Sequence, residues 1–228
     1  MKKYLVISAA IAAAALVLLP NPAAAQRWDM NVYGGWSYSN LSGGSTTLAD
    51  GNYTSRFGAG AGAELRLNED WGWEFGLWYI QKGTQGTFTA SPSDPAFFPQ
   101  PNQTFDGNVN LDYVEVPILV NVYFPVGDKA NVRGYIGPTF SFMTSAKVDG
   151  TLDGQSTNQD ISDKLDDADF TIMIGAGGEW HLSRVDLLLD FRWDWGLTNI
   201  TKVDGVELRN STVLITAGVG FSLTKEEE

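Results

Sequence analysis

Apolar and polar residues alternate with a period of two along most of the chain. Between residues 53 and 67, one set of alternate positions is apolar apart from Ser55. The other set holds glycines and three charged residues, Arg56, Glu64 and Arg66. Because successive side chains of a strand point to opposite sides, this pattern predicts a strand with one apolar face and one charged face.

The same alternation recurs along the chain, in segments of about ten residues that are long enough to cross a bilayer when tilted. A soluble β-sandwich would bury the apolar faces between two sheets, and a periplasmic all-β domain of this kind stays open as an alternative. A barrel in lipid would turn these faces outward and keep the charges inside. The eight predicted strands span residues 28–38, 53–67, 71–80, 113–122, 132–142, 170–180, 185–195 and 212–221.

Long and short connections alternate between the predicted strands. The long ones span 39–52, 83–108, 143–168 and 198–210, and the short ones span 68–70, 124–130 and 183–184. Up-and-down barrels of the outer membrane have long extracellular loops and short periplasmic turns. The sequence therefore predicts an all-β fold, an eight-stranded antiparallel up-and-down transmembrane β-barrel, with both mature termini in the periplasm.

The first residues have the features of an export signal. A positively charged start is followed by an apolar run over residues 5–19 and by small residues ending at Ala25. The run is about 15 residues long, shorter than the roughly 20 that a spanning helix needs. We therefore expect residues 1–25 to be a signal peptide cleaved after Ala25, and residues 26–228 to form a single outer-membrane β-barrel domain.

Composition narrows the class of protein further. The net charge of −12 argues against a nucleic-acid partner, because such partners require a basic face. The absence of cysteine excludes disulfides, a thiolate metal site and a lipid-modified N-terminal cysteine. The mean hydropathy of −0.12 is too low for a helical membrane protein. A membrane barrel can have a low mean hydropathy, because polar and apolar residues alternate along its strands.

Four segments carry a resemblance to a known family. The most specific is a Tyr-x-Glu-x-Pro pattern at residues 113–117, followed by an Arg-x-x-x-Gly-Leu pattern at residues 192–197. Together with residues 135–140 and 175–180, they resemble the PorT-like outer-membrane β-barrel family, a branch of the OmpA-like eight-stranded barrels. The resemblance covers residues 26–223 and implies the fold and the location. It implies function only loosely, because one class of members assists a secretion system and most have no assigned role.

Charged residues on the inward faces are the main candidate site. Buried charges must be paired, since an isolated one costs several kcal/mol or becomes neutral. An eight-stranded barrel is only just wide enough inside for side chains, so we expect a plug of ion pairs. Glycines on the same faces leave lumen volume free and keep a narrow channel open as an alternative. The predicted structural network consists of Arg56, Glu64, Arg66, Glu74, Glu115, Arg133, Glu179, Asp190 and Arg192.

No catalytic, cofactor-binding or metal-binding residue is predicted. His181 is the only histidine and falls beside a short turn, where we expect a solvated side chain. The third long loop is rich in aspartate, but its spacing does not match an EF-hand. We expect that loop to be solvated and mobile, with calcium binding as the alternative.

The sequence thus predicts a non-enzymatic outer-membrane protein that presents extracellular loops in a structural or interaction role. Outer-membrane lipid would surround it, no cofactor is expected, and a protein partner could bind at extracellular loops 2 and 3. Loop 2 is rich in proline and phenylalanine between residues 92 and 101. The alternatives are a narrow channel for small solutes or ions, and an accessory barrel of a protein secretion system. The sequence leaves the oligomeric state open.

Overall fold

The computed structural model describes residues 27–43, 51–89 and 103–223. The predicted signal peptide and the Pro-rich segment of the second loop lie outside these residues. Within the described residues, no helix is long and apolar enough to span a membrane. The elements in chain order are β1 (Arg27–Ser42), β2 (Thr54–Arg66), β3 (Trp71–Thr89), β4 (Thr104–Pro125), β5 (Ala130–Leu152), β6 (Gln155–Asp160), η2 (Ser162–Lys164), β7 (Ala168–His181), β8 (Asp186–Gly196) and β9 (Arg209–Ser222).

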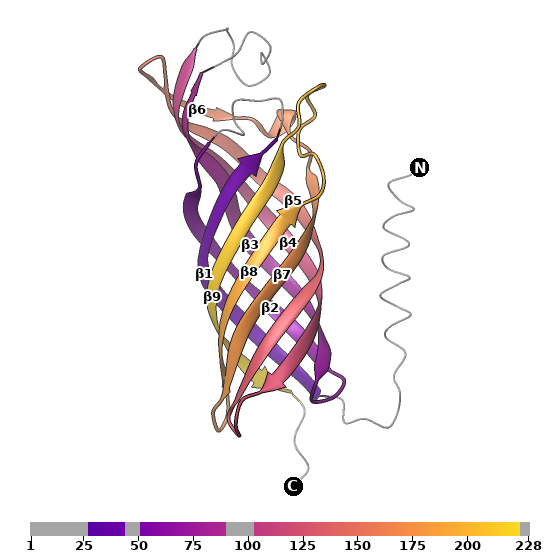
Figure 1. Cartoon of the computed structure of the whole chain (residues 1–228). Helices are drawn as coiled ribbons and strands as arrows, with labels where there is room; N and C mark the ends of the chain where they lie inside the picture. Colours follow the sequence, from indigo (N-terminus) through magenta and orange to yellow (C-terminus); the bar gives the residue numbers. More distant parts are fainter. Residues whose placement is uncertain (1–26, 44–50, 90–102, 224–228) are drawn as a thin grey trace.

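Eight of the nine strands close into a ring (Figure 1). Each ring strand pairs antiparallel with its neighbours along the chain, and β1 pairs with both β2 and β9. The pairing of β4 with β5 completes the circle, so no ring strand has a free edge across the membrane. The predicted eight-stranded up-and-down barrel is confirmed.

The ninth strand corrects the predicted strand count. β6 lies outside the ring and pairs only with the last residues of β5, from Lys147 to Leu152. Asp153 and Gly154 join β5 to β6, with φ angles of 49° and 80°. Positive φ at both central residues is the geometry of a type I′ turn, for which Asp-Gly is a favoured sequence.

Several ring strands are longer than predicted, and β3, β4 and β5 exceed the prediction most. β3 continues to Thr89, β4 begins at Thr104 and β5 runs to Leu152, so the predicted connections 83–108 and 143–168 were wrong at their edges. The added stretches are rich in Thr, Asn, Gln, Gly and Asp. Their outer faces are polar, because they lie beyond the apolar zone of the barrel, and apolar residues such as Phe105, Val109 and Leu111 face the interior instead. The outward apolar pattern used for the prediction therefore ends before these stretches.

The two ends of the barrel differ. The short connections lie at one end together with Arg27 and Leu223, and we call this the turn end. The carboxamide oxygen of Asn68 accepts hydrogen bonds from the backbone of Asp70 and Trp71, which tightens the turn between β2 and β3. The longer connections, with β6 and η2, lie at the opposite end, which we call the loop end.

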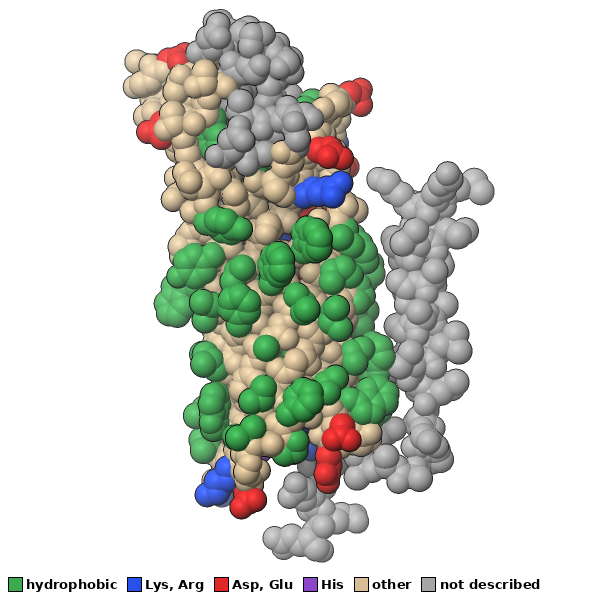
Figure 2. Space-filling view, viewed as in Figure 1, with side chains coloured by type: hydrophobic (Ala, Val, Ile, Leu, Met, Phe, Trp, Pro, Cys, Tyr) green, Lys and Arg blue, Asp and Glu red, His purple; other side chains and the backbone are tan. Residues whose placement is uncertain are grey.

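Burial is inverted relative to a water-soluble protein. Large apolar side chains face outward, as with Trp36, which is 63% exposed. The charged side chains of Glu74 and Arg133 are completely buried inside the ring. Figure 2 shows the apolar side chains over the middle of the barrel and charged ones toward its ends. A continuous apolar outer band around a polar interior is the pattern expected in a bilayer.

Candidate functional site

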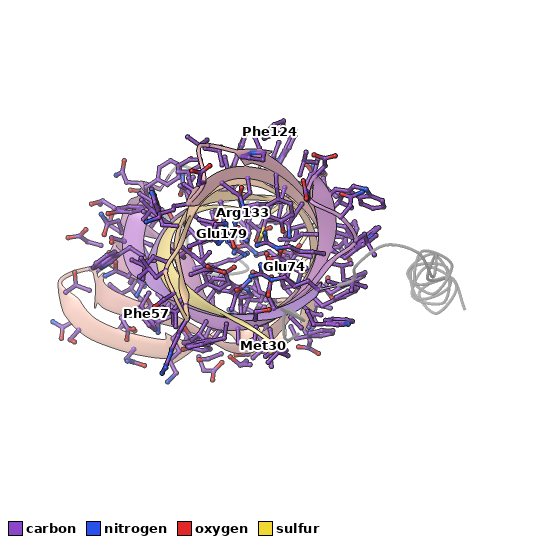
Figure 3. All side chains as sticks on the ribbon, turned by 90° about the horizontal axis from the view of Figure 1, so that it is seen from below. Met30, Phe57, Glu74, Phe124, Arg133 and Glu179 are labelled. Atoms are coloured by element: carbon purple, nitrogen blue, oxygen red, sulfur yellow. The ribbon has the colours of Figure 1, made fainter. Side chains whose placement is uncertain are left out.

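Buried side chains line the barrel interior from one end to the other. Strand parity places charged residues toward the turn end, a group of aromatic residues in the middle, a buried lysine above them and an apolar cluster at the loop end. Figure 3 looks into the ring from the turn end. Glu74, Arg133 and Glu179 point inward in this view, whereas Met30 and Phe124 point away from the ring.

Arginines and carboxylates from six strands form one connected set of ion pairs near the turn end. Arg133 binds Asp190 through two nitrogens, at 3.1 and 2.7 Å, and also lies 3.5 Å from Glu64. Arg66 of β2 crosses the lumen to Glu179 of β7. We call this set the turn-end network: Arg27, Asp29, Glu64, Arg66, Glu74, Arg133, Glu179, Asp186, Asp190 and Arg192.

The turn-end network carries unequal numbers of opposite charges. Its four guanidinium groups face six carboxylates. With all these groups ionised and the adjacent His181 neutral, every carboxylate has an arginine partner, but the network as a whole carries a net charge of −2. An uncompensated charge in the barrel interior is unfavourable. Binding of a cation or of protons would therefore stabilise the network.

Aromatic rings pack against the inner side of the network. Tyr33 stacks on Trp78 with 5.2 Å between ring centroids. The guanidinium carbon of Arg192 lies 4.6 Å from the Trp78 centroid and 4.7 Å from that of Tyr33. Such cation–π contacts stabilise a desolvated guanidinium.

Lys82 forms a second ionic group above the aromatic residues. Its Nζ lies 2.6 Å from Asp194 Oδ2 and 2.7 Å from Glu115 Oε1, and all three side chains are completely buried. The hydroxyl of Thr171 donates to Asp194, and that of Ser141 donates to Glu115 at 2.8 Å. One ammonium group thus joins two carboxylates that would otherwise repel each other.

An apolar cluster closes the loop end. Residues of the two connections that follow β6 and β8 fold onto the inner faces of β1, β3, β4 and β5. Backbone hydrogen bonds hold these connections in place, from Ile161 to Ala146 at 3.0 Å and from Asp166 to Ile200 at 2.8 Å. We call this cluster the loop-end cap: Leu41, Phe88, Phe105, Val109, Leu111, Tyr113, Ala146, Ile161, Leu165, Ile200, Val206 and Leu208.

The acidic third loop contains more secondary structure than was expected of a solvated loop. Most of its aspartates are exposed, but β6, η2 and the buried Ile161 order its backbone. Asp169 is buried and accepts from Asn210 at 2.8 Å. The backbone and hydroxyl of Ser162 hydrogen-bond to Asp160, which holds the pKa of that carboxyl below its ordinary value. Within the described part of the chain, these aspartates form no group of metal-ligating atoms.

The structure brings together all but one of the residues predicted for the lumen network. Eight of the nine lie in the turn-end network or around Lys82. Arg56 is the exception, because it is half-buried and forms no ion pair with any described residue. The register of β2 with β3 stops at Gly58 and Ile80, so Arg56 lies where the two strands have separated.

The prediction missed several ionic residues of the interior. Lys82 was assigned to no strand, yet it lies two residues beyond the inward-facing Ile80. The alternation of inward and outward positions, continued two residues along the strand, would have identified Lys82 as inward-facing. Asp29, Asp186 and Asp194 also face inward by parity and belong to these ionic groups.

His181 is more tightly held than a solvated turn residue. Its Nδ1 lies 2.8 Å from Asp186 Oδ1, and its Nε2 lies 2.9 Å from the amide nitrogen of Asn131. Glu179 Oε1 is 3.9 Å from the same Nδ1. Both ring nitrogens therefore have partners at the edge of the turn-end network.

Three solved structures illustrate the similarity of this chain to known proteins. Neisserial surface protein A is 17% identical, over 84% of this chain and 96% of that chain, with a TM-score of 0.45. OprG from Pseudomonas aeruginosa is 12% identical, over 89% and 99%, with a TM-score of 0.49. Ail of Yersinia pestis is 15% identical, over 85% and 98%, with a TM-score of 0.38. Among curated proteins, none matches the chain.

Residues 21–202 match the family described as "Outer membrane protein beta-barrel domain". The matched region holds seven of the eight ring strands, from β1 to β8 without β6. The apolar outer band and the closed hydrogen-bonded ring are the features that a β-barrel needs in a bilayer. The chain therefore belongs to the outer-membrane β-barrel family and is a protein of the bacterial outer membrane.

Proposed function

We propose that this protein is a non-conducting anchor that displays its loop end at the cell surface for contact with other macromolecules. In this arrangement the turn end and both mature termini face the periplasm. The observation that carries the proposal is the double closure of the lumen, by ion pairs toward one end and by the apolar loop-end cap at the other. No catalytic role is assigned to any residue.

The closure argues against the narrow-channel alternative. A channel needs a continuous polar path, whereas the loop-end cap places residues such as Leu41, Leu111 and Ile200, each with no exposed surface, across the outer mouth. Ions entering from the other side would meet arginines and carboxylates that already bind one another. Opening a path would require breaking buried ion pairs, which is strongly unfavourable.

The length of the strands supports a role at the surface. With a rise of about 3.3 Å per residue and a tilt of about 40°, the 22 residues of β4 reach roughly 55 Å along the barrel axis. The 11 residues of β8 reach only about 28 Å, close to the roughly 25 Å of the apolar band. Much of β3, β4 and β5 therefore extends beyond the membrane as an ordered wall (Figure 1).

Planar-bilayer recording tests the closed lumen. Mature protein, residues 26–228, would be refolded into vesicles, and insertion would be checked by flotation of the vesicles in a density gradient. We expect no stepwise current at 100 mV in 1 M salt. Steady open-channel conductance from the inserted wild-type protein would contradict the proposal and would favour the channel.

Surface labelling tests the display of the loop end. The chain has no cysteine, so Asp153→Cys marks the β5–β6 turn and Asp128→Cys marks the turn between β4 and β5. We expect a membrane-impermeant maleimide to label Asp153→Cys on intact cells. Asp128→Cys, the matched control, should react only after the outer membrane is permeabilised. The reverse result would mean that the orientation is wrong.

A further inference from the structure

Three metal-ligating side chains meet at the turn end of the barrel. Glu179 and His181 are two residues apart on β7, so both point to the inner face, and Asp186 of β8 pairs directly opposite His181. One ligand atom from each residue lies within 4.8 Å of the others. Because β7 and β8 form a single short hairpin, the three donors are held by a rigid part of the ring.

The hydrogen bonding of this group is incomplete. Glu179 is 1% exposed, and its Oε2 has no hydrogen-bond partner among the described residues. Its other oxygen, Oε1, binds Arg66. Asp186 likewise binds Arg27 through Oδ2, at 3.3 Å, and turns Oδ1 toward the imidazole. Each carboxylate thus uses one oxygen to bind an arginine, the arrangement of outer-shell partners that orients metal ligands elsewhere.

The electrostatics also favour a cation. Glu179 and Asp186 belong to the turn-end network, in which four arginines face six carboxylates. Lys129 and Arg184 lie in the neighbouring turns, and neither forms an ion pair with a described residue. A bound divalent ion would match the net negative charge of the network.

From these observations we infer that Glu179, His181 and Asp186 form a binding site for a divalent transition-metal ion. One imidazole nitrogen and two carboxylate oxygens suit zinc and related ions, which bind nitrogen and oxygen donors at about 2.0–2.2 Å. The three donors need to draw together from their present spacing, which side-chain rotation allows. The side chain of His181 is 29% exposed, so water can complete the coordination.

Metal binding requires one proton to move on the imidazole. In the metal-free arrangement, the nitrogen next to Nε2 is the amide nitrogen of Asn131, which can only donate, so the proton of a neutral imidazole belongs on Nδ1, facing Asp186. With metal on Nδ1, the proton resides on Nε2. Rotation of the Asn131 amide by half a turn would then present its oxygen as the acceptor. The same residue therefore supports the imidazole in both states.

The test uses the refolded mature chain without a histidine tag, titrated with zinc ion alone. Calorimetry should detect one saturable site per chain. His181→Gln should weaken this binding by more than about 100-fold, because even outer-shell changes weaken metal sites by 10- to 100-fold. Asp128→Asn, which removes an exposed carboxylate from the turn between β4 and β5, should leave the binding unchanged.

Nitrogen NMR gives a second readout that needs no variant. His181 is the only histidine of the chain, so the imidazole signals are assigned without ambiguity. Zinc should shift the Nδ1 resonance and leave the proton on Nε2. Absence of saturable zinc binding by the wild type would overturn the inference. So would unchanged imidazole resonances at saturating zinc, or equal binding by His181→Gln.

Discussion

Replacing Lys82 with methionine is the most informative single change in the barrel interior. The substitution keeps an unbranched side chain only one atom shorter and removes the charge. It leaves Glu115 and Asp194 buried beside each other with no positive partner, since the Lys82 ammonium lies 2.7 and 2.6 Å from their oxygens. The remaining hydroxyl donors from Ser141 and Thr171 are neutral and cannot compensate two negative charges.

The size of the effect follows from the burial of the group. Removing one partner of a buried ion pair costs about 3–5 kcal/mol, because the other charge stays desolvated. We therefore expect Lys82→Met to lower the free energy of unfolding by about 3–5 kcal/mol. Adding Asp194→Asn should recover part of this loss, because one carboxylate then disappears. The double variant also keeps the test usable if the single variant does not refold.

Urea unfolding in lipid vesicles, followed by tryptophan fluorescence, measures the loss. Lys202→Met is the matched control, because Lys202 and Asp167 form an exposed pair at 3.7 Å, with side chains 43% and 88% exposed. We expect that control to stay within about 0.5 kcal/mol of the wild type. If Lys82→Met were as stable as Lys202→Met, the buried ionic group would not stabilise the barrel as argued.

Two further changes test the outer face and the loop-end cap. Leu77 is 60% exposed on the outside of β3, so Leu77→Arg should destabilise the barrel in a bilayer by about 2–4 kcal/mol. Leu182→Arg, at the turn end, should cost no more than about 1 kcal/mol, and equal losses would refute the depth assignment. Leu165→Ala should lower the local stability of the cap by about 2–5 kcal/mol. Hydrogen exchange should then quicken at Ile161 and Asp166 but not in the ring, and uniform quickening would contradict a locally folded cap.

The ring was predictable because its outer face carries a strong period-two signal. Every second residue of β8 from Leu187 to Trp195 is large and apolar. These side chains face outward, where contact with lipid favours apolar residues. β6 was not predictable, because residues 155–160 include no apolar side chain. The cap was hidden for a related reason: Ile161 and Leu165 stand among polar residues and become a cluster only when distant connections meet.

The interior site was predictable in part. Strand parity identifies Glu74 and Arg133 as inward-facing from the sequence alone. Parity cannot give the partners, because Arg66 reaches Glu179 across the ring, and that contact depends on the stagger of all eight strands. Parity also cannot show that Arg56 lies outside the ionic groups. That position results from the separation of β2 and β3 beyond Gly58.

Heat modifiability of the mature chain tests the central claim most directly, because it reports whether an inverted, lipid-facing ring forms at all. The protein, residues 26–228, would be refolded in detergent and run on an SDS gel with and without boiling. A closed ring with an apolar outer band should resist SDS, so the unheated sample should migrate faster than the boiled one. Equal migration, with solubility in the absence of detergent, would contradict the membrane barrel and would require the outward apolar faces to be buried against another protein layer.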